Sequence, residues 1–141
     1  MKIKVKKLVS NAKLPLVTDG NACFDFYANR HYVVNPLDNI AIKTGLAFEI
    51  PAGYHMRLFM RSSTGRNTGL RLSNCVGIVD SSYRGEVVAC FNNIDQRTYE
   101  IKQGDRFLQG LIEKDIPVEF EEVDELGETK RGTGGFGSTG R

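Results

Sequence analysis

The sequence predicts an all-β protein: a jelly-roll-like β-barrel or sandwich with a flexible glycine-rich C-terminal arm. Apolar residues mostly recur with period two, turn-forming residues bound the short runs, and no long stretch shows the helical period of 3.6. Many short strands at such spacing are typical of antiparallel sandwiches and barrels. We therefore expect two packed or closed sheets rather than a helical or α/β domain.

The individual strands follow from the alternation along the chain. The run at residues 46–50 ends at Pro51-Ala52-Gly53, which is a good turn signal. One short helix is expected at residues 62–69, where Ser62 and Ser63 could cap the first turn. The other strands are predicted at residues 2–8, 22–28, 40–43, 56–60, 76–79, 86–91, 98–102, 106–113 and 118–123.

Length and composition limit the classes of function. The 141 residues fit one domain, which we place at residues 1–126, with residues 127–141 as the arm. A net charge of +2 is too weak a basic field to predict nucleic-acid binding. The four lysines in the first seven residues alternate with Ile3 and Val5, as on the solvent face of a strand. No apolar run approaches the ~20 residues that span a bilayer, so no membrane partner is expected.

The cysteines and histidines predict neither disulfides nor a histidine-ligated metal. Cys23, Cys75 and Cys90 are odd in number and form no C-x-x-C pair, which favours a reducing, cytoplasmic location. His31 and His55 lie far apart in the sequence and give little support to a histidine-ligated site.

The glycine-rich end is open to two interpretations, a disordered terminus or a nucleotide-binding tail. Residues 135–140 satisfy the G-x-G-x-x-G pattern, but the dinucleotide-binding motif requires a following helix and only Arg141 remains. Glycine amides can still approach anionic oxygens closely. Arg131, Ser138 and Thr139 add donors suited to a phosphate, and Phe136 offers a flat face for a base or sugar.

Two further polar clusters could contribute to a site. Residues 61–66 could bind an anion at the start of a helical turn, or form an ordinary capped turn. Residues 74–86 are interpreted as a hairpin with Asp80 near its tip, where an Asp is either a local backbone acceptor or a general base. Asn74 could read a pyrimidine edge, and Asp25, among apolar neighbours, is either hydrogen-bonded structurally or placed for a cation.

Taken together and in order, five segments resemble the five motifs of the trimeric dUTPase family. The third contains G-I-V-D and Y-R-G, and the fifth matches almost letter for letter. Three positions depart from the usual motifs: Cys23 and Ser63 replace common glycines, and Ser82 stands where an acid is common. The segments are residues 22–26, 61–63, 74–86, 104–109 and 131–140, which together span nearly the whole chain.

The resemblance implies a homotrimer that hydrolyses dUTP to dUMP and pyrophosphate at three sites between subunits. Asp80 would deprotonate the water that attacks the α-phosphorus, and Asp25 would hold a water of the Mg²⁺ shell. Asn74 and the backbone around Gly77 would read uracil, while Tyr83 would pack on the deoxyribose. Phe136, arriving on a swapped arm, would stack over the base. The phosphate-binding residues would be Arg61, Ser62, Ser63, Gln109, Arg131, Gly137, Ser138 and Thr139.

Two other functions remain open from the sequence. A dCTP deaminase-like relative would share the fold class but would need a catalytic glutamate at the pyrimidine, for which we find no good candidate. A regulatory protein that senses dUTP would make the same contacts without turnover, and would imply a protein partner that the sequence does not identify.

Overall fold

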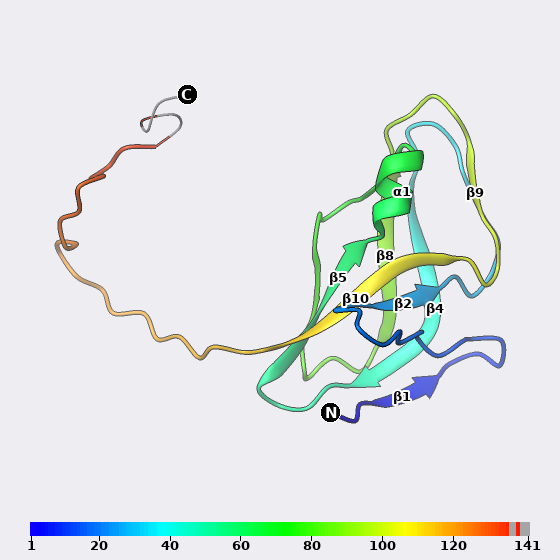
Figure 1. Ribbon diagram of the computed structural model, residues 1–141, viewed down its shortest axis with the longest axis horizontal. Helices are drawn as coiled ribbons and strands as arrows, with labels where there is room; N and C mark the ends of the chain where they lie inside the picture. The colour runs from blue at the N-terminus through cyan, green and yellow to red at the C-terminus, as the bar shows by residue number, and fades with distance from the viewer. Residues whose placement is uncertain (136–137, 139–141) are drawn as a thin grey trace.

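The computed structural model describes residues 1–135 and residue 138. Within this part of the chain the protein is a β-sandwich with one short helix, α1 (Ser62–Asn67) (Figure 1). That helix is too short to span a membrane, and no other helix occurs among the described residues. The strands are β1 (Lys4–Lys7), β2 (Phe24–Tyr27), β3 (Tyr32–Val34), β4 (Asn39–Glu49), β5 (Tyr54–Met60), β6 (Leu70–Leu72), β7 (Gly77–Val79), β8 (Glu86–Asn93), β9 (Tyr99–Ile101) and β10 (Arg106–Lys114).

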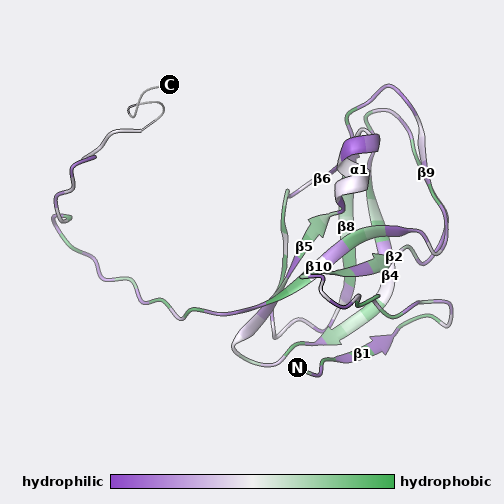
Figure 2. Cartoon of the chain, in the orientation of Figure 1, coloured by the Kyte–Doolittle hydropathy of each residue, from purple (hydrophilic) through white to green (hydrophobic). Residues whose placement is uncertain are grey.

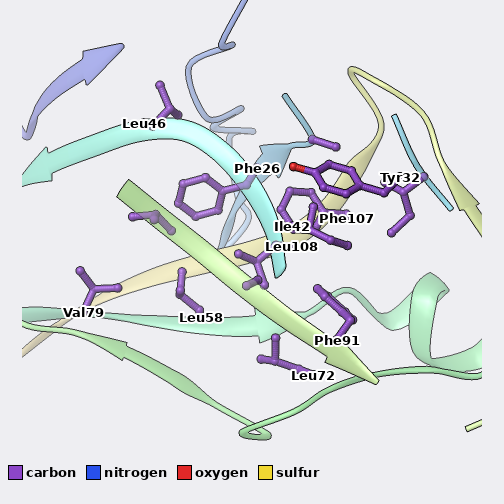
Figure 3. Packing of buried hydrophobic residues seen from close by; sticks show 14 of the residues in the cluster. Phe26, Tyr32, Ile42, Leu46, Leu58, Leu72, Val79, Phe91, Phe107 and Leu108 are labelled. Atoms are coloured by element: carbon purple, nitrogen blue, oxygen red, sulfur yellow. The ribbon is translucent and has the colours of Figure 1, made fainter. Parts of the chain in front are cut away.

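Two four-stranded sheets form the sandwich, with strand orders β1-β4-β8-β6 and β2-β10-β5-β7, and β3 and β9 form a separate pair. All pairs are antiparallel. Alternate side chains from both sheets fill the space between them, among them Phe26, Leu108 and Phe91 (Figure 3). The all-β, jelly-roll-like expectation is confirmed.

Strand β4 joins two runs that the sequence analysis separated. The backbone at Gly45 has a φ of 73°, and the pairing of β4 with β8 shifts register between Lys43 and Ala47. A side chain at Gly45 would lie 2.7 Å from Val9 and 2.9 Å from Ala12, so the bulge admits only glycine without rearrangement. The strand therefore bends around the core instead of ending in a turn.

The short elements were the least well predicted. Strands β3 and β6, of three residues each, were not predicted. Helix α1 lies where expected, but the capping prediction is wrong. Its N-cap is Arg61, which makes no side-chain cap hydrogen bond, and Ser62 and Ser63 both lie inside the helix.

The predicted hairpin at residues 74–86 is also wrong. Strand β7 pairs with β5 in one sheet, whereas β8 pairs with β4 and β6 in the other. A Cβ at Gly77 would lie 3.1 Å from the Leu58 side chain, so β7 packs closely on β5. Residues 80–85 therefore cross from one sheet to the other, and Asp80 lies in this β7–β8 connection.

The segment after β10 leaves the sandwich (Figures 1 and 2). The strand predicted at residues 118–123 is wrong, because the described chain offers this segment no pairing partner. Its apolar side chains are exposed instead, with Val118 at 72% and Phe120 at 94% of full exposure. The apolar residues of this segment do alternate, but within one chain they pack against no other surface.

Candidate functional site

A polar pocket of about 430 Å³, here called the β2–β10 pocket, opens where β2, β10 and the end of β5 meet. The register places Gln109 of β10 opposite Asp25 of β2 on one side and Phe59 of β5 on the other. Arg61 and Ser62 follow β5 directly and reach the same pocket. Segments far apart in the sequence thus bring Asp25, Arg61, Ser62 and Gln109 together, as the candidate site requires.

The Asp25 carboxylate is shared by two arginines. Its Oδ1 accepts from Arg61 Nε at 3.0 Å, and its Oδ2 accepts from Arg106 Nη1 at 3.1 Å. Arg61 also donates to the Arg106 carbonyl oxygen at 3.0 Å, which closes the network. Because only 20% of the Asp25 side chain is exposed, these pairs compensate for the loss of hydration. This geometry gives Asp25 a structural role, and any role toward a cation must use the lone pairs that the arginines leave free.

The fit of Asp25 to a metal ion depends on its remaining lone pairs. Each carboxylate oxygen has two, and each uses one on an arginine, so each can still accept from a water. Two flanking guanidinium groups disfavour direct contact with a cation. Within residues 1–135 and 138, no group of three or more His, Cys, Asp or Glu could hold a metal ion. The pocket therefore fits water-mediated contact with Mg²⁺ on an anionic ligand, rather than a protein-held ion.

Arg106 is a site residue that the sequence analysis missed. It stands in the fourth motif-like segment, residues 104–109, but was given no role, since a charged residue that opens a strand is ordinary and its partner Asp25 lies 81 positions away. Only the β2–β10 register, which pairs Arg106 with Tyr27, brings the two side chains within reach. An Asp in an otherwise apolar strand needs a cationic partner, and a search for that partner could have pointed to Arg106.

A second pocket of about 210 Å³, the β7–β8 pocket, contains Asn74, Gly77, Asp80 and Tyr83. The Tyr83 hydroxyl donates to the Glu86 carbonyl oxygen at 3.0 Å, and the Tyr83 N–H donates to the Asp80 carbonyl oxygen at 3.1 Å. These two bonds hold the tyrosine ring against the connection. The four predicted residues are thus brought together, although the predicted hairpin is absent.

The backbone around the β7–β8 pocket is constrained at two points. A Cβ at Gly85 would overlap the Tyr83 hydroxyl, so glycine leaves room for the ring. Cys75, beside Asn74, has a φ of 61°, which is uncommon for a residue with a side chain. Such strained positions recur at ligand-binding sites, where surrounding structure holds them in place.

The two acids of the β7–β8 pocket differ in their bonding. Glu86 accepts the Gly45 N–H at 2.8 Å, and its other oxygen lies 3.7 Å from Lys43 Nζ. The exposed Asp80 carboxylate accepts no hydrogen bond from any described residue. The Asp80 carboxylate is therefore open to water or a ligand, whereas both Glu86 oxygens already face a protein partner.

The remaining predicted residues lie elsewhere. Ser63 is exposed on α1 and lines neither pocket. Arg131 and Ser138 are exposed in the segment beyond the sandwich, where Arg131 Nε donates to the Gly134 carbonyl oxygen at 2.8 Å. Phe136, Gly137 and Thr139 lie outside the described residues. The two pockets share no lining residue, so one chain keeps the predicted site in three separate places.

The fold and pockets define a class: an antiparallel sandwich protein with a polar pocket lined by arginine and amide side chains. Comparison with known proteins narrows that class, because the dUTPase family model matches residues 11–140. The deoxyuridine 5'-triphosphate nucleotidohydrolase of Helicobacter pylori is 37% identical over 141 residues, covering 99% of this chain and 97% of the relative. The enzyme of that name from Nautilia profundicola is 39% identical and covers all of both chains.

A solved structure agrees with the sequence relatives. A variant of the Staphylococcus bacteriophage 80alpha dUTPase, with dUpNHpp, superposes with a TM-score of 0.90 at 27% identity, over 99% of both chains. The chain belongs to the dUTPase family. Its first-motif departure is also accommodated, since Cys23 does not have the positive φ that would require glycine.

Proposed function

We propose that this chain hydrolyses dUTP to dUMP and pyrophosphate, with Asp80 as the general base. The observation that carries the proposal is the contrast between two aspartates: Asp80 is unpaired beside Asn74 and Tyr83, whereas Asp25 is held by two arginines. Family membership and the names of its relatives support the same reaction. Hydrolysis of dUTP keeps uracil out of DNA and supplies dUMP for thymidylate synthesis.

In this mechanism the β7–β8 pocket selects the nucleoside. Asn74 offers both a donor and an acceptor to the uracil edge, and the backbone at Gly77 completes the contact. Tyr83 packs on the deoxyribose and leaves no room for a 2′-hydroxyl. Asp80 then takes a proton from the water that attacks the α-phosphorus in line, and pyrophosphate leaves.

Donors from the β2–β10 pocket and the arm stabilise charge on the phosphate oxygens as it develops. Asp25 acts through water toward a Mg²⁺ carried by the triphosphate, as its free lone pairs allow. When bound, Mg²⁺ supplies charge neutralisation on those oxygens. The proposed phosphate ligands are Arg61, Ser62, Ser63, Gln109, Arg131, Gly137, Ser138 and Thr139, with Phe136 stacked over uracil.

A homotrimer would join these parts. The two pockets share no residue, and the arm leaves the sandwich, so copies of the chain are the simplest source of the missing contacts. Strand β1 ends its sheet with one edge unpaired, next to an apolar groove of about 450 Å³ that includes Ile3 and Val5. The alternating Ile116, Val118 and Phe120 of a second copy suit that edge and groove.

Charge supports the same arrangement. Lys6 and Lys7 lie on β1 beside Lys4, which pairs with Glu49, and Lys2 precedes the strand, while residues 119–128 of the segment after β10 hold six acids and no base. A cytoplasmic location is part of the proposal, and it agrees with the three cysteines being free in the structure.

The alternatives make different demands on the pocket. A deaminase needs a glutamate that can act on the pyrimidine, but Glu86 is committed to Gly45 and Lys43. A regulatory dUTP sensor would bind dUTP without hydrolysing it. A regulatory protein partner is compatible with both the sensor and the hydrolase.

The test is pyrophosphate release from dUTP, UTP, dTTP and dCTP, each with and without Mg²⁺. We expect pyrophosphate to be released from dUTP and from none of the other three nucleotides. The rate of release should depend strongly on Mg²⁺. Ammonia release from dCTP that exceeds dUTP hydrolysis would overturn the proposal, as would tight dUTP binding without pyrophosphate.

A further inference from the structure

A cluster of charged side chains lies where β10 ends and the segment that leads to the arm leaves the sandwich. The last residues of β10 pair with the start of β5, placing Glu113 opposite His55. His55 Nδ1 lies 2.7 Å from Asp115 Oδ1, and Nε2 lies 3.6 Å from Glu113 Oε2. Because a carboxylate only accepts, Nδ1–H is the donor to Asp115. Arg57 donates to Glu113 at 3.1 Å and completes the cluster.

Asp115 is also the last residue fixed to the sandwich. Its backbone N–H donates to the Gly53 carbonyl oxygen at 2.8 Å, just beyond the end of β10. From residue 116 to residue 128 no hydrogen bond is formed among the described residues, and every one of these residues is exposed. The chain therefore changes at one point from fixed strand to free segment.

We propose that His55 and Asp115 form a clamp that positions the arm for catalysis in a neighbouring subunit. This inference rests on the proposed function, in which the arm supplies phosphate donors. The clamp lines neither pocket, so both residues act only through the arm.

The physical reason is effective concentration. An arm that starts from a fixed point, in a fixed direction, samples less space and meets its target more often. The bond is partly sheltered from competing water, since the His55 side chain is 23% exposed and the Asp115 side chain 43% exposed. Without the clamp the last pairs of β10 would fray, and part of the binding free energy would be spent on ordering them again.

Loss of the clamp should weaken binding of the triphosphate but not of the monophosphate. Loss of the clamp should raise the KM for dUTP roughly two- to fivefold, as expected for one weakened ordering contact. Inhibition by dUMP should not change, because dUMP has no β- or γ-phosphate for the arm to bind. A purely structural defect would weaken both ligands together or lower the melting temperature without this split.

The experiment compares His55→Ala, His55→Asn and Asp115→Ala with the full-length wild-type enzyme. His55→Asn keeps an N–H donor near the position of Nδ1 and should restore most of the KM, whereas the two alanine variants should not. His31→Ala is the matched control, since His31, just before β3, also pairs with a glutamate, 3.3 Å from Glu100 of β9, but lies far from the arm in sequence. For each protein KM and kcat for dUTP, Ki for dUMP and the melting temperature are measured.

The outcomes separate the clamp from the proposed function. If wild type does not hydrolyse dUTP, the proposed function fails. If wild type is active but the alanine variants keep its KM, or lose dUMP binding in parallel, only the clamp is overturned. If His55→Ala does not fold, Asp115→Ala, which leaves the β5–β10 pairing residues intact, decides the question.

Discussion

The two polar pockets each contain one aspartate, and the two aspartates differ in hydrogen bonding and in exposure to solvent. In the β2–β10 pocket, Asp25 is braced by Arg61 and Arg106 and is largely shielded from solvent. In the β7–β8 pocket, Asp80 is exposed and accepts no hydrogen bond from the described residues. A group that must accept a proton is best left unpaired, while a group that aligns cationic donors is best paired. The contrast separates the proposed base from the proposed organiser.

The largest expected effect is at the unpaired aspartate. Asp80→Asn should lower kcat for dUTP about 10²- to 10⁴-fold, because an amide cannot take the proton, while substrate binding is kept. Steady-state kinetics and equilibrium binding of a non-hydrolysable dUTP analogue measure the two parts. Glu100→Gln, which removes an exposed carboxylate outside both pockets, is the control. Near-normal turnover in Asp80→Asn would show that Asp80 is not the general base.

The next largest effect tests the third part of the site. Truncation after Lys130 removes donors that serve the phosphates and, among the residues that the structure describes, no buried one, so kcat/KM should fall about 10²-fold or more. Light scattering should still find a trimer, with an unchanged melting temperature. A truncated protein that dissociates would make residues 131–141 structural rather than catalytic.

A smaller and different effect is expected at the braced aspartate. Asp25→Asn leaves two arginines without their charge partner, and should lower the free energy of unfolding by about 1–3 kcal/mol. Urea denaturation measures the loss, with Glu49→Gln as the control because its pair with Lys4 is a surface pair. If the two variants unfold alike, the network does not brace the pocket. Turnover should fall less in Asp25→Asn than in Asp80→Asn.

The smallest effect uses a paired carboxylate outside both pockets as a reference. Hydrogen bonds from the Tyr99 hydroxyl and then from Arg97 lower the pKa of Asp95 from 3.8 to about 2. The ionised form therefore stabilises the fold above the ordinary pKa, and this contribution is lost as the pH falls toward 2. The stability difference between wild type and Asp95→Asn should shrink over that range, with no change in kcat at neutral pH. A difference that stays constant with pH would contradict the linkage.

Much of the fold could be predicted from the sequence because alternation is a local signal. Strands β5, β8 and β10 were found because one face of each is buried, so their apolar residues recur every second position. The β7–β8 connection was misread because alternation does not say which strand a run pairs with. The run at residues 118–123 was misread for the converse reason: its alternation belongs to a surface that one chain does not bury.

The site was predictable residue by residue but not in its geometry. Asp25, Asp80 and Tyr83 stand in motif-like segments, whereas the ion pair of Arg106 with Asp25 depends on strand register across 81 positions. The clamp at His55 and Asp115 was equally hidden, because neither residue belongs to a motif. These contacts come from strand pairing between distant segments, and the periodicity of residues along the sequence carries no information about that pairing.

The claim that the site is composite can be tested most directly by mixing two inactive chains. Asp80→Asn supplies a complete arm, and the chain truncated after Lys130 supplies an intact Asp80. If each site takes Asp80 and the arm from different subunits, random trimers formed from equal amounts should recover about one quarter of the wild-type sites. We predict this recovery of dUTP hydrolysis on co-assembly. Activity that stays at the level of the separate variants would contradict it, because Asp80 and the arm would then act within one chain.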